Sequence, residues 1–174
     1  MMREQVMSRV ILVTGGFDPL HTGHIKLLKD AKGYSETKLI VGLNSDDWLL
    51  RKKGKVFQTW NDRATILYNL KCVDDVLPFD DKDDSAINAI QQCLPQEVIF
   101  CNGGDRGQSN TPEYEHFKDN PKVRFLWGVG GKDKLNSSSF IQFEKTDRIW
   151  GYYKVLYTGN NFKVKELVIN PNSS

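Results

Sequence analysis

The chain lacks several features that would assign it to common classes of protein. It contains no apolar run long enough to cross a bilayer, and its first seven residues are too polar for a signal peptide. Its formal net charge is only +2 at pH 7, so charge gives no indication of a nucleic-acid or membrane surface. These absences predict a cytoplasmic protein that binds neither nucleic acid nor membrane.

Cysteine and histidine are also scarce. The three cysteines (Cys72, Cys93 and Cys101) are odd in number, lie in apolar contexts and show no C-x-x-C spacing, which predicts reduced, structural thiols. A zinc site needs three or four ligands. Since only His116 accompanies the histidine pair His21 and His24, and no cysteine lies near that pair, the sequence disfavours zinc.

Apolar segments of strand length alternate with helical segments along most of the 174 residues, enough for one domain with a short appendage. The expected strands are Val10–Val13, Lys38–Leu43, Asp75–Phe79, Val98–Cys101 and Val123–Trp127. The expected helices are Gly23–Ala31, Asn61–Lys71, Ser85–Leu94 and Thr111–Lys118. This alternation predicts an α/β fold with a Rossmann-like, five-stranded parallel sheet covered by helices on both faces, and a ligand at the carboxyl ends of the strands.

The pattern changes near the C-terminus. A short helix over Ser137–Phe143 is expected to close the first domain, which we place at residues 1–147. In residues 148–174, two alternating segments, Ile149–Tyr157 and Phe162–Ile169, flank Thr158–Asn161, which predicts a β-hairpin tail.

The segment GGFDPLHTGH at residues 15–24 follows the first expected strand and leads into a helix. Backbone N–H groups and the dipole at a helix start favour an anion, and Gly15, Gly16 and Gly23 are expected to let the backbone approach one closely. His21 and His24 are three residues apart, so they project to the same side and can donate hydrogen bonds to phosphoryl oxygens. The alternative is that both histidines cap or pack the helix, but Thr22 is the expected cap.

Residues 16–24, GFDPLHTGH, resemble the signature G-x-F-D-x-x-H-x-G-H of the cytidylyltransferase family of nucleotidyltransferases. The resemblance extends over roughly residues 11–141 and adds Phe17 to the phosphate-binding segment. It also implies that Asp18 lies close to a metal ion. Asp18 is therefore expected either to hold Mg²⁺ or to orient the loop through backbone N–H groups as an Asx turn.

A basic segment, RKKGK at residues 51–55, falls where similar enzymes carry a flexible loop with two lysines. The spacing back from Arg63 matches those two lysines to Lys52 and Lys55. Lys55 is the stronger candidate for catalysis. Arg63 matches a family arginine, with a surface ion pair as the alternative. Asp74 matches a family aspartate, with an ordinary turn residue as the alternative.

Two later segments complete the expected site. Gly104 and Asp105, within CNGGDR at residues 101–106, resemble the G-G-D element of heptose-phosphate adenylyltransferases, although a tight turn is an alternative. Ser137, Ser138 and Ser139 resemble the I-S-S-T-x-I-R motif that presents hydroxyl and N–H groups to phosphates, and without the family they form a good N-cap cluster. Gln142 stands where that motif has arginine, so Lys132, Lys134 or Lys145 would have to supply the positive charge for the triphosphate.

The resemblance implies a nucleotidyltransferase that joins an NTP and a phosphorylated alcohol or sugar, with release of pyrophosphate and with Mg²⁺ as cofactor. CTP is the first choice of donor. The alternatives are an adenylyltransferase that uses ATP and a sugar 1-phosphate, and a nucleotide-binding sensor without turnover. A homodimer is expected because homologues of this fold commonly dimerise. The tail resembles the opening strands of the cupin in mannose-6-phosphate isomerases, which implies a piece of a longer protein.

Overall fold

The structure is a computed structural model, and it describes residues 8–33, 37–104, 106–131, 146–158 and 162–171. The chain divides into two compact units, Met1–Leu135 and Asn136–Ser174, which are described separately below. The expected helix over Ser137–Phe143 lies outside the described residues.

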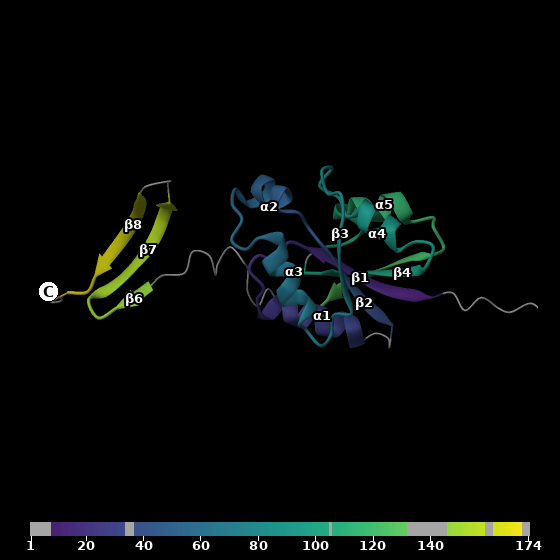
Figure 1. The fold of residues 1–174 in the computed structure, drawn as a ribbon, viewed down its shortest axis with the longest axis horizontal. Coiled ribbons are helices and arrows are strands. Elements are labelled where there is room, and N and C mark those ends of the chain that lie inside the picture. Colours follow the sequence, from purple (N-terminus) through teal and green to yellow (C-terminus); the bar gives the residue numbers. More distant parts are fainter. Residues whose placement is uncertain (1–7, 34–36, 105, 132–145, 159–161, 172–174) are drawn as a thin grey trace, which may run out of the picture. The chain divides into compact units, whose positions relative to one another are not determined.

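The first unit is built on a parallel sheet of five strands in the order β3-β2-β1-β4-β5 (Figure 1). Their bounds are β1 Arg9–Gly15, β2 Lys38–Leu43, β3 Asp75–Pro78, β4 Glu97–Gly103 and β5 Val123–Val129. This order confirms the predicted Rossmann-like sheet. It also places the reversal of strand order between β1 and β4, where ligands of doubly wound folds bind.

Helices cover both faces of the sheet, as the alternation predicts. The helices are α1 Thr22–Gly33, α2 Asp46–Lys53, α3 Trp60–Tyr68, α4 Ile87–Cys93 and α5 Pro112–Phe117. On one face, Ile11 and Val13 of β1 pack with α1 and α3. On the other, Val10 and Leu12 pack with α4 and α5. Because successive side chains of a strand point to opposite faces, β1 is buried along both sides and forms the centre of the core.

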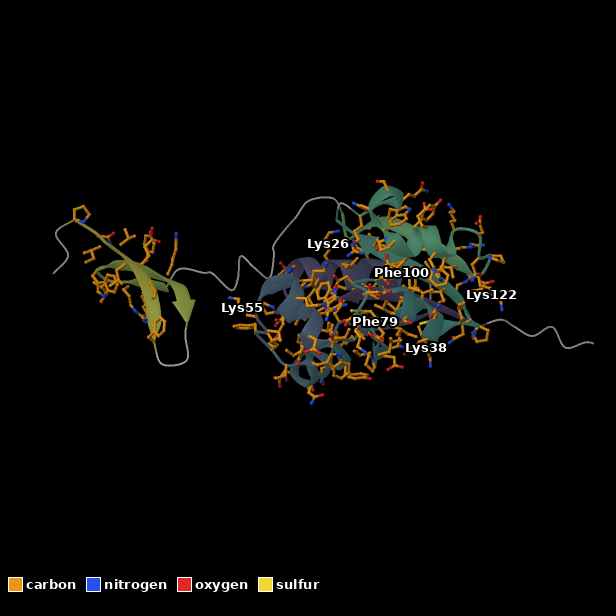
Figure 2. All side chains as sticks on the ribbon, turned by 90° about the horizontal axis from the view of Figure 1, so that it is seen from above. Lys26, Lys38, Lys55, Phe79, Phe100 and Lys122 are labelled. Carbon is orange, nitrogen blue, oxygen red and sulfur yellow. The ribbon has the colours of Figure 1, made fainter. Side chains whose placement is uncertain are left out.

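Large apolar side chains fill this core, while most charged ones lie outside it. Figure 2 shows Phe79 and Phe100 inside the first unit, with Lys26, Lys38 and Lys122 at its periphery. The three cysteines are free, as predicted, and burial raises the pKa of the Cys93 thiol to about 11 and that of Cys101 to about 12. Within the described residues, no helix has the length and apolar character needed to span a membrane.

The second unit is a three-stranded antiparallel sheet, β6 Thr146–Arg148, β7 Gly151–Thr158 and β8 Lys163–Ile169, in that order. The predicted hairpin of β7 and β8 is confirmed, and β6 adds a short third strand. Ile149 was expected in the first strand of the hairpin, but it lies in the turn between β6 and β7 and is fully exposed. A glycine is required at position 151, the first residue of β7, because an added Cβ would overlap the carbonyl oxygen of Val168.

Candidate functional site

A cleft of about 510 Å³ opens at the carboxyl ends of β1, β4 and β5, beside the first turns of α1. A volume of this size is typical of small-molecule sites. Its lining comes from four stretches of chain: Thr14, Gly15 and Phe17; Gly23, His24 and Leu27; Cys101, Asn102, Gly103, Gly104 and Arg106; and Val129, Gly130 and Gly131. The cleft therefore lies where the strand order reverses.

Two glycines before α1 make room for neighbouring side chains. A Cβ on Gly15 would meet the Phe17 ring at 3.1 Å, and a Cβ on Gly16 would meet the Leu49 side chain at 2.8 Å. The absent Cβ atoms thus make room for Phe17 and for α2. Gly15 and Gly23 also line the cleft, and the close approach of their backbone to an anion stays a prediction.

His21 is the residue that caps α1. Its carbonyl oxygen accepts from the N–H of Ile25 at 3.1 Å, and its Nδ1 accepts from the N–H of His24 at 3.4 Å. The expectation that Thr22 is the cap is therefore wrong, because Thr22 is already the first helical residue. A ring nitrogen that accepts carries no proton, so Nε2 is the nitrogen from which the His21 ring can donate.

His24 lies in the first turn of α1 and is held between two rings. It stacks on His21 with ring centroids 3.6 Å apart and meets the edge of Phe17 at 4.9 Å. Its Nδ1 is buried and has no hydrogen-bond partner among the described residues. Burial, with further contributions from His21 and Lys53, lowers the pKa of His24 from 6.5 to about 3. His24 is thus a neutral imidazole at physiological pH.

Asp18 holds a distant loop in place. Its carboxylate is fully buried and accepts from the backbone N–H groups of Phe57 and Gln58, each at 2.8 Å. Of the two expected roles, this geometry supports the orienting one, although the N–H groups belong to the segment before α3 rather than to an Asx turn. The carboxylate is fully buried, accepts a backbone N–H on each oxygen and does not line the cleft, so this geometry does not fit a magnesium ligand.

Arg63 is a buried connector rather than a surface residue. Only 1% of it is exposed, and its guanidinium donates to the carbonyl oxygens of Gly16 and Asn44 and to the carboxylate of Asp46. Its Nε donates to the carbonyl of Gln58. Arg63 does form the ion pair of the alternative, with Asp46 at 2.6 Å, but its guanidinium is buried rather than at the surface. Every nitrogen of the guanidinium is bonded to the protein, which does not support the expected contact with phosphate.

The basic segment also differs from expectation. Arg51, Lys52 and Lys53 form the last turn of α2, which ends at Gly54 with a φ of +72°. Ser45, an acidic first turn, a basic last turn and Gly54 are a helix start and stop pattern, and this signal could have located α2. The expected flexible loop is therefore shorter and begins only after Lys53.

Lys53 is the lysine that α2 brings to the histidines. Its ammonium donates to the carbonyl oxygen of Asp18 at 3.1 Å, and its charge contributes to the lowered pKa of His24. Burial lowers the pKa of Lys53 itself, with Asp18 opposing that shift and Arg63 adding to it. Counting back from Arg63 does not identify Lys53, because the direction of a side chain on α2 depends on how that helix packs.

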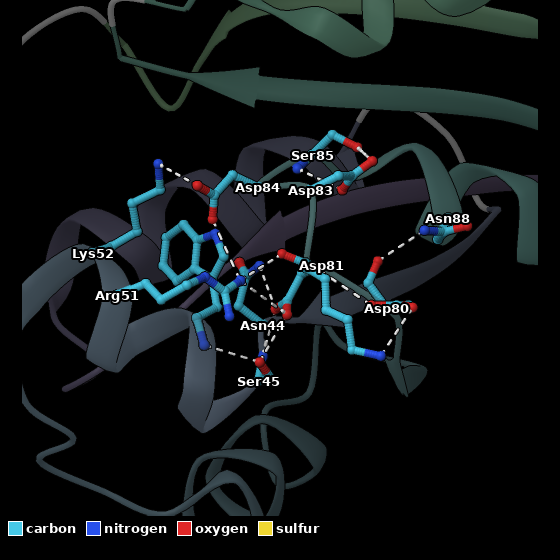
Figure 3. Close-up of polar contacts among 12 residues, drawn as sticks. Asn44, Ser45, Arg51, Lys52, Asp80, Asp81, Asp83, Asp84, Ser85 and Asn88 are labelled. Atoms are coloured by element: carbon cyan, nitrogen blue, oxygen red, sulfur yellow. Dashed lines mark hydrogen bonds and ion pairs between the residues drawn. The ribbon is translucent and has the colours of Figure 1, made fainter.

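Lys52 and Lys55 lie differently. The ammonium of Lys52 forms an ion pair with Asp84 at 3.2 Å (Figure 3). Lys55 lies at the edge of the first unit, beyond the end of α2 (Figure 2). Neither residue lines the cleft.

A hydrogen-bonded cluster fixes α2 on the sheet. Figure 3 shows that buried Asp81 accepts from the side chains of Asn44 and Ser45, at 3.0 and 2.7 Å. Arg51 donates to the carbonyl oxygen of Asp81 at 2.7 Å. Because both ends of α2 are tied to the loop after β3, the position of Lys53 is set by contacts far from the cleft.

The remaining candidates separate into three groups. Gly104 lines the cleft with a φ of +65°, as expected for the loop after β4. Asp105, Ser137, Ser138, Ser139 and Gln142 lie outside the described residues, so their roles stay predictions. The Asp74 carboxylate accepts from the N–H of Leu39 at the amino end of β2. The cleft lies at the carboxyl ends of the strands, so this contact of Asp74 is a structural one away from the cleft.

Two residues of the CNGGDR segment line the cleft without a role predicted from the sequence. Arg106 contributes a guanidinium to the lining, and Asn102 is buried there. Both follow β4 directly, so their place after a strand was a signal that could have identified them. Within the part of the chain that the structure describes, no group of three or more histidine, cysteine or acidic side chains is arranged to hold a metal ion.

Comparisons with known proteins agree with this geometry. The family model described as cytidylyltransferase-like matches residues 12–164. Among curated proteins, the bifunctional protein HldE of Helicobacter hepaticus is 32% identical over 139 residues, which cover 79% of this chain and 28% of that protein. HldE of Geotalea uraniireducens is 39% identical over 136 residues, covering 74% of this chain and 26% of that protein. The chain thus spans about a quarter of the length of these relatives.

Solved structures show the same fold. The lipopolysaccharide core biosynthesis protein from Thermoplasma volcanium matches with a TM-score of 0.55 and 27% identity, over 73% of this chain and 99% of that chain. A putative nicotinate-nucleotide adenylyltransferase from Vibrio parahaemolyticus matches with a TM-score of 0.50 and 11% identity, over 78% and 84% of the two chains. At that identity the second match supports the fold alone.

Proposed function

Because the chain belongs to the cytidylyltransferase-like family, we propose that it transfers a nucleotidyl group from an NTP to a phosphorylated sugar. An oxygen of the acceptor phosphate attacks the α-phosphorus of the NTP. The bond from that phosphorus to the bridging oxygen breaks, and pyrophosphate leaves with the electron pair. The observation that carries the proposal is a pair of stacked imidazoles at the start of α1, where His21 caps the helix and His24 lines the cleft.

Both histidines supply hydrogen bonds, and His24 does so as a neutral imidazole. Neutral His24 offers one N–H, and His21 offers Nε2–H, to the oxygens of the α-phosphate. Negative charge grows on these oxygens in the transition state, so donors fixed in place stabilise that state more than the bound substrate. The N-terminal N–H groups of α1 and its dipole act in the same direction.

Lys53 supplies a positive charge near His24. Its ammonium is partly desolvated, so an anion beside it is more favourable than it would be in bulk water. Lys55, Lys52 and the hydroxyls of Ser137, Ser138 and Ser139 keep their predicted roles on the leaving pyrophosphate. Arg106 is a further candidate for the charge that Gln142 does not provide.

Magnesium enters this proposal with the substrate. NTPs carry Mg²⁺ on their phosphate oxygens, and the ion neutralises charge on the leaving group. Asp18 is not proposed to hold it, since both of its carboxylate oxygens accept from backbone N–H groups. No step therefore depends on a metal ion held by the protein.

Two observations favour a sugar phosphate as the acceptor. Gly103, Gly104 and Asp105 resemble the G-G-D element of heptose-phosphate adenylyltransferases. The neighbour from Thermoplasma volcanium is named for biosynthesis of the lipopolysaccharide core, which contains sugars. The same motif favours ATP as donor, whereas the family description favours CTP. A cytoplasmic location, where NTPs are made, is part of the proposal.

The test is pyrophosphate release with each of the four NTPs against a set of sugar 1-phosphates and phosphorylated alcohols. We expect release with CTP or ATP and a sugar phosphate, with the nucleotide-activated sugar identified by mass spectrometry. Nucleotide binding without release for every pair would contradict the proposal and support the alternative of a sensor without turnover. Release with glycerol phosphate alone would replace the sugar with a simple phosphorylated alcohol.

A further inference from the structure

Asn102 is a buried polar residue without a complete set of hydrogen bonds, and it lines the cleft. It belongs to the end of β4, and only 5% of the residue is exposed. Its Nδ2 is buried and has no hydrogen-bond partner among the described residues. Buried amide groups are nearly always bonded in folded proteins, so an exception in a binding cleft indicates a ligand that completes the bond.

The backbone around Asn102 interrupts the regular sheet. Cys101 pairs with Leu126 and Gly103 pairs with Val129, so β5 contains one more residue than β4 across this interval. An extra residue of this kind is a β-bulge, and bulges next to binding sites change the direction of neighbouring side chains. The ladder is thus irregular opposite Asn102, at the carboxyl end of the sheet.

The cleft that Asn102 lines has apolar surface as well as charge. Leu27, Val129 and the protonated thiol of Cys101 contribute the apolar surface, and burial raises the pKa of that thiol to about 12. The guanidinium of Arg106 is part of the same lining. Phosphate is expected beside His24, where the helix start and Lys53 favour an anion. If the phosphates of a nucleotide bind there, its base is the apolar, planar part that can contact the rest of the cleft.

We infer that Asn102 reads the nucleobase of the NTP, with Nδ2 donating a hydrogen bond to a ring nitrogen or carbonyl oxygen at the edge of the base. This inference rests on the proposed function and names a specificity residue within its site. Asn102 makes no contact with the reacting phosphorus in this assignment. It acts on which base is accepted and on how tightly the nucleotide binds.

The experiment compares Asn102→Ala and Asn102→Asp with the parent enzyme in pyrophosphate release, using all four NTPs at saturating acceptor. We expect the ratio of kcat/KM between the preferred and the next-best NTP to fall about tenfold, because one buried hydrogen bond to the base is lost. The KM of the acceptor should not change. A ratio between nucleotides does not depend on the fraction of folded enzyme, so partial unfolding cannot produce this result.

Asn61→Asp is the matched control, because it makes the same change on the exposed start of α3, away from the cleft. Its nucleotide ratio should equal that of the parent. Unchanged nucleotide ratios in both Asn102 variants would overturn the inference while leaving the proposed function intact. A change only in the KM of the acceptor would overturn it as well, and would assign Asn102 to the sugar.

A second measurement keeps the inference testable if the parent enzyme turns over no substrate. Calorimetric titration with NTP analogues that carry a methylene group between the α- and β-phosphorus measures base preference without transfer. A base preference in the parent that is lost in Asn102→Ala supports the inference even when the proposed function has failed. Equal affinity of the parent for all four bases, or no binding, overturns it.

Discussion

The imidazole rings of His21 and His24 stack with their centroids 3.6 Å apart and an interplanar angle of 19°. At this separation one positive charge strongly disfavours a second, and His21 accordingly contributes to the lowered pKa of His24. The Nδ1 of His21 also accepts from the backbone of His24. The pair therefore disfavours two cations at the start of α1, and His24 presents a neutral, oriented donor there.

The first prediction concerns His24→Ala. We expect kcat to fall by about 10²- to 10³-fold with little change in the KM of the NTP, because the lost hydrogen bond is strongest in the transition state. His21→Ala should behave similarly. Steady-state pyrophosphate release measures both, with His116→Ala as the control because His116 is exposed on α5. An unchanged kcat in His24→Ala would end the catalytic assignment.

The second prediction concerns stability and pH. The folded-state pKa of His24, about 3, is lower than its unfolded value of 6.5, so the unfolded chain binds more protons between these values. The contribution of His24 to the free energy of unfolding is complete above pH 6.5 and is lost as the pH falls toward 3, at roughly 1 kcal/mol per pH unit. Urea unfolding of the parent and of His24→Gln at about pH 7.5 and about pH 5 measures the difference. An identical loss in the two proteins would contradict the prediction.

The third prediction separates the lysines. Lys53→Ala is expected to lower kcat/KM for the NTP by about tenfold or more, because its ammonium lies beside the phosphate site. Lys55→Ala should also reduce turnover and leave the thermal midpoint close to that of the parent. Lys52→Ala should have a smaller effect, since its ammonium is engaged by Asp84. Lys122→Ala, at the amino end of the sheet, is the control. A collapse in stability with normal kinetics for Lys55→Ala would make that residue structural.

The fourth prediction treats Arg63 as a positioning residue. Arg63→Lys keeps the charge but cannot reach the carbonyls of Gly16, Asn44 and Gln58 and the carboxylate of Asp46 together. We expect a loss of about 3 kcal/mol in the free energy of unfolding. Arg9→Lys, in an exposed pair with Glu97, should lose less than about 1 kcal/mol. Chemical denaturation compares them. Parent-like stability together with a raised KM for the NTP would instead make Arg63 a phosphate ligand.

The fifth prediction concerns residues 148–174. The apolar side chains of Ile149, Phe162, Val164, Leu167 and Ile169 are exposed, and exposed strand edges of this kind recruit partners. Deletion of residues 148–174 should change the oligomeric state or the solubility while nucleotidyl transfer continues. Light scattering and pyrophosphate release test both parts. Abolished activity with an unchanged oligomer would place the tail in the active site and move the boundary expected after residue 147.

The sequence determined the sheet, the helix faces and the central motif, because each depends on local periodicity and turn chemistry. Apolar β1 and the amphipathic segments over α1 and α3 bury their side chains in the faces that their spacing predicts. The position of GGFDPLHTGH after a strand and before a helix was sufficient to place His24 in the cleft. Ser45 and Gly54 also mark the start and the end of α2, although the basic residues before Gly54 resemble a flexible loop.

Only the tertiary structure separated the polar residues that lie at the cleft from those that hold the scaffold. Asp18 and Arg63 stand at motif positions, yet one bonds to backbone N–H groups about forty residues away and the other to carbonyls from three separate segments. Lys53 rather than its neighbour Lys52 approaches the histidines because the direction of a helical side chain depends on how α2 packs against the loop after β3. These roles arise from contacts between segments distant in the chain, and residue type and spacing alone do not encode them.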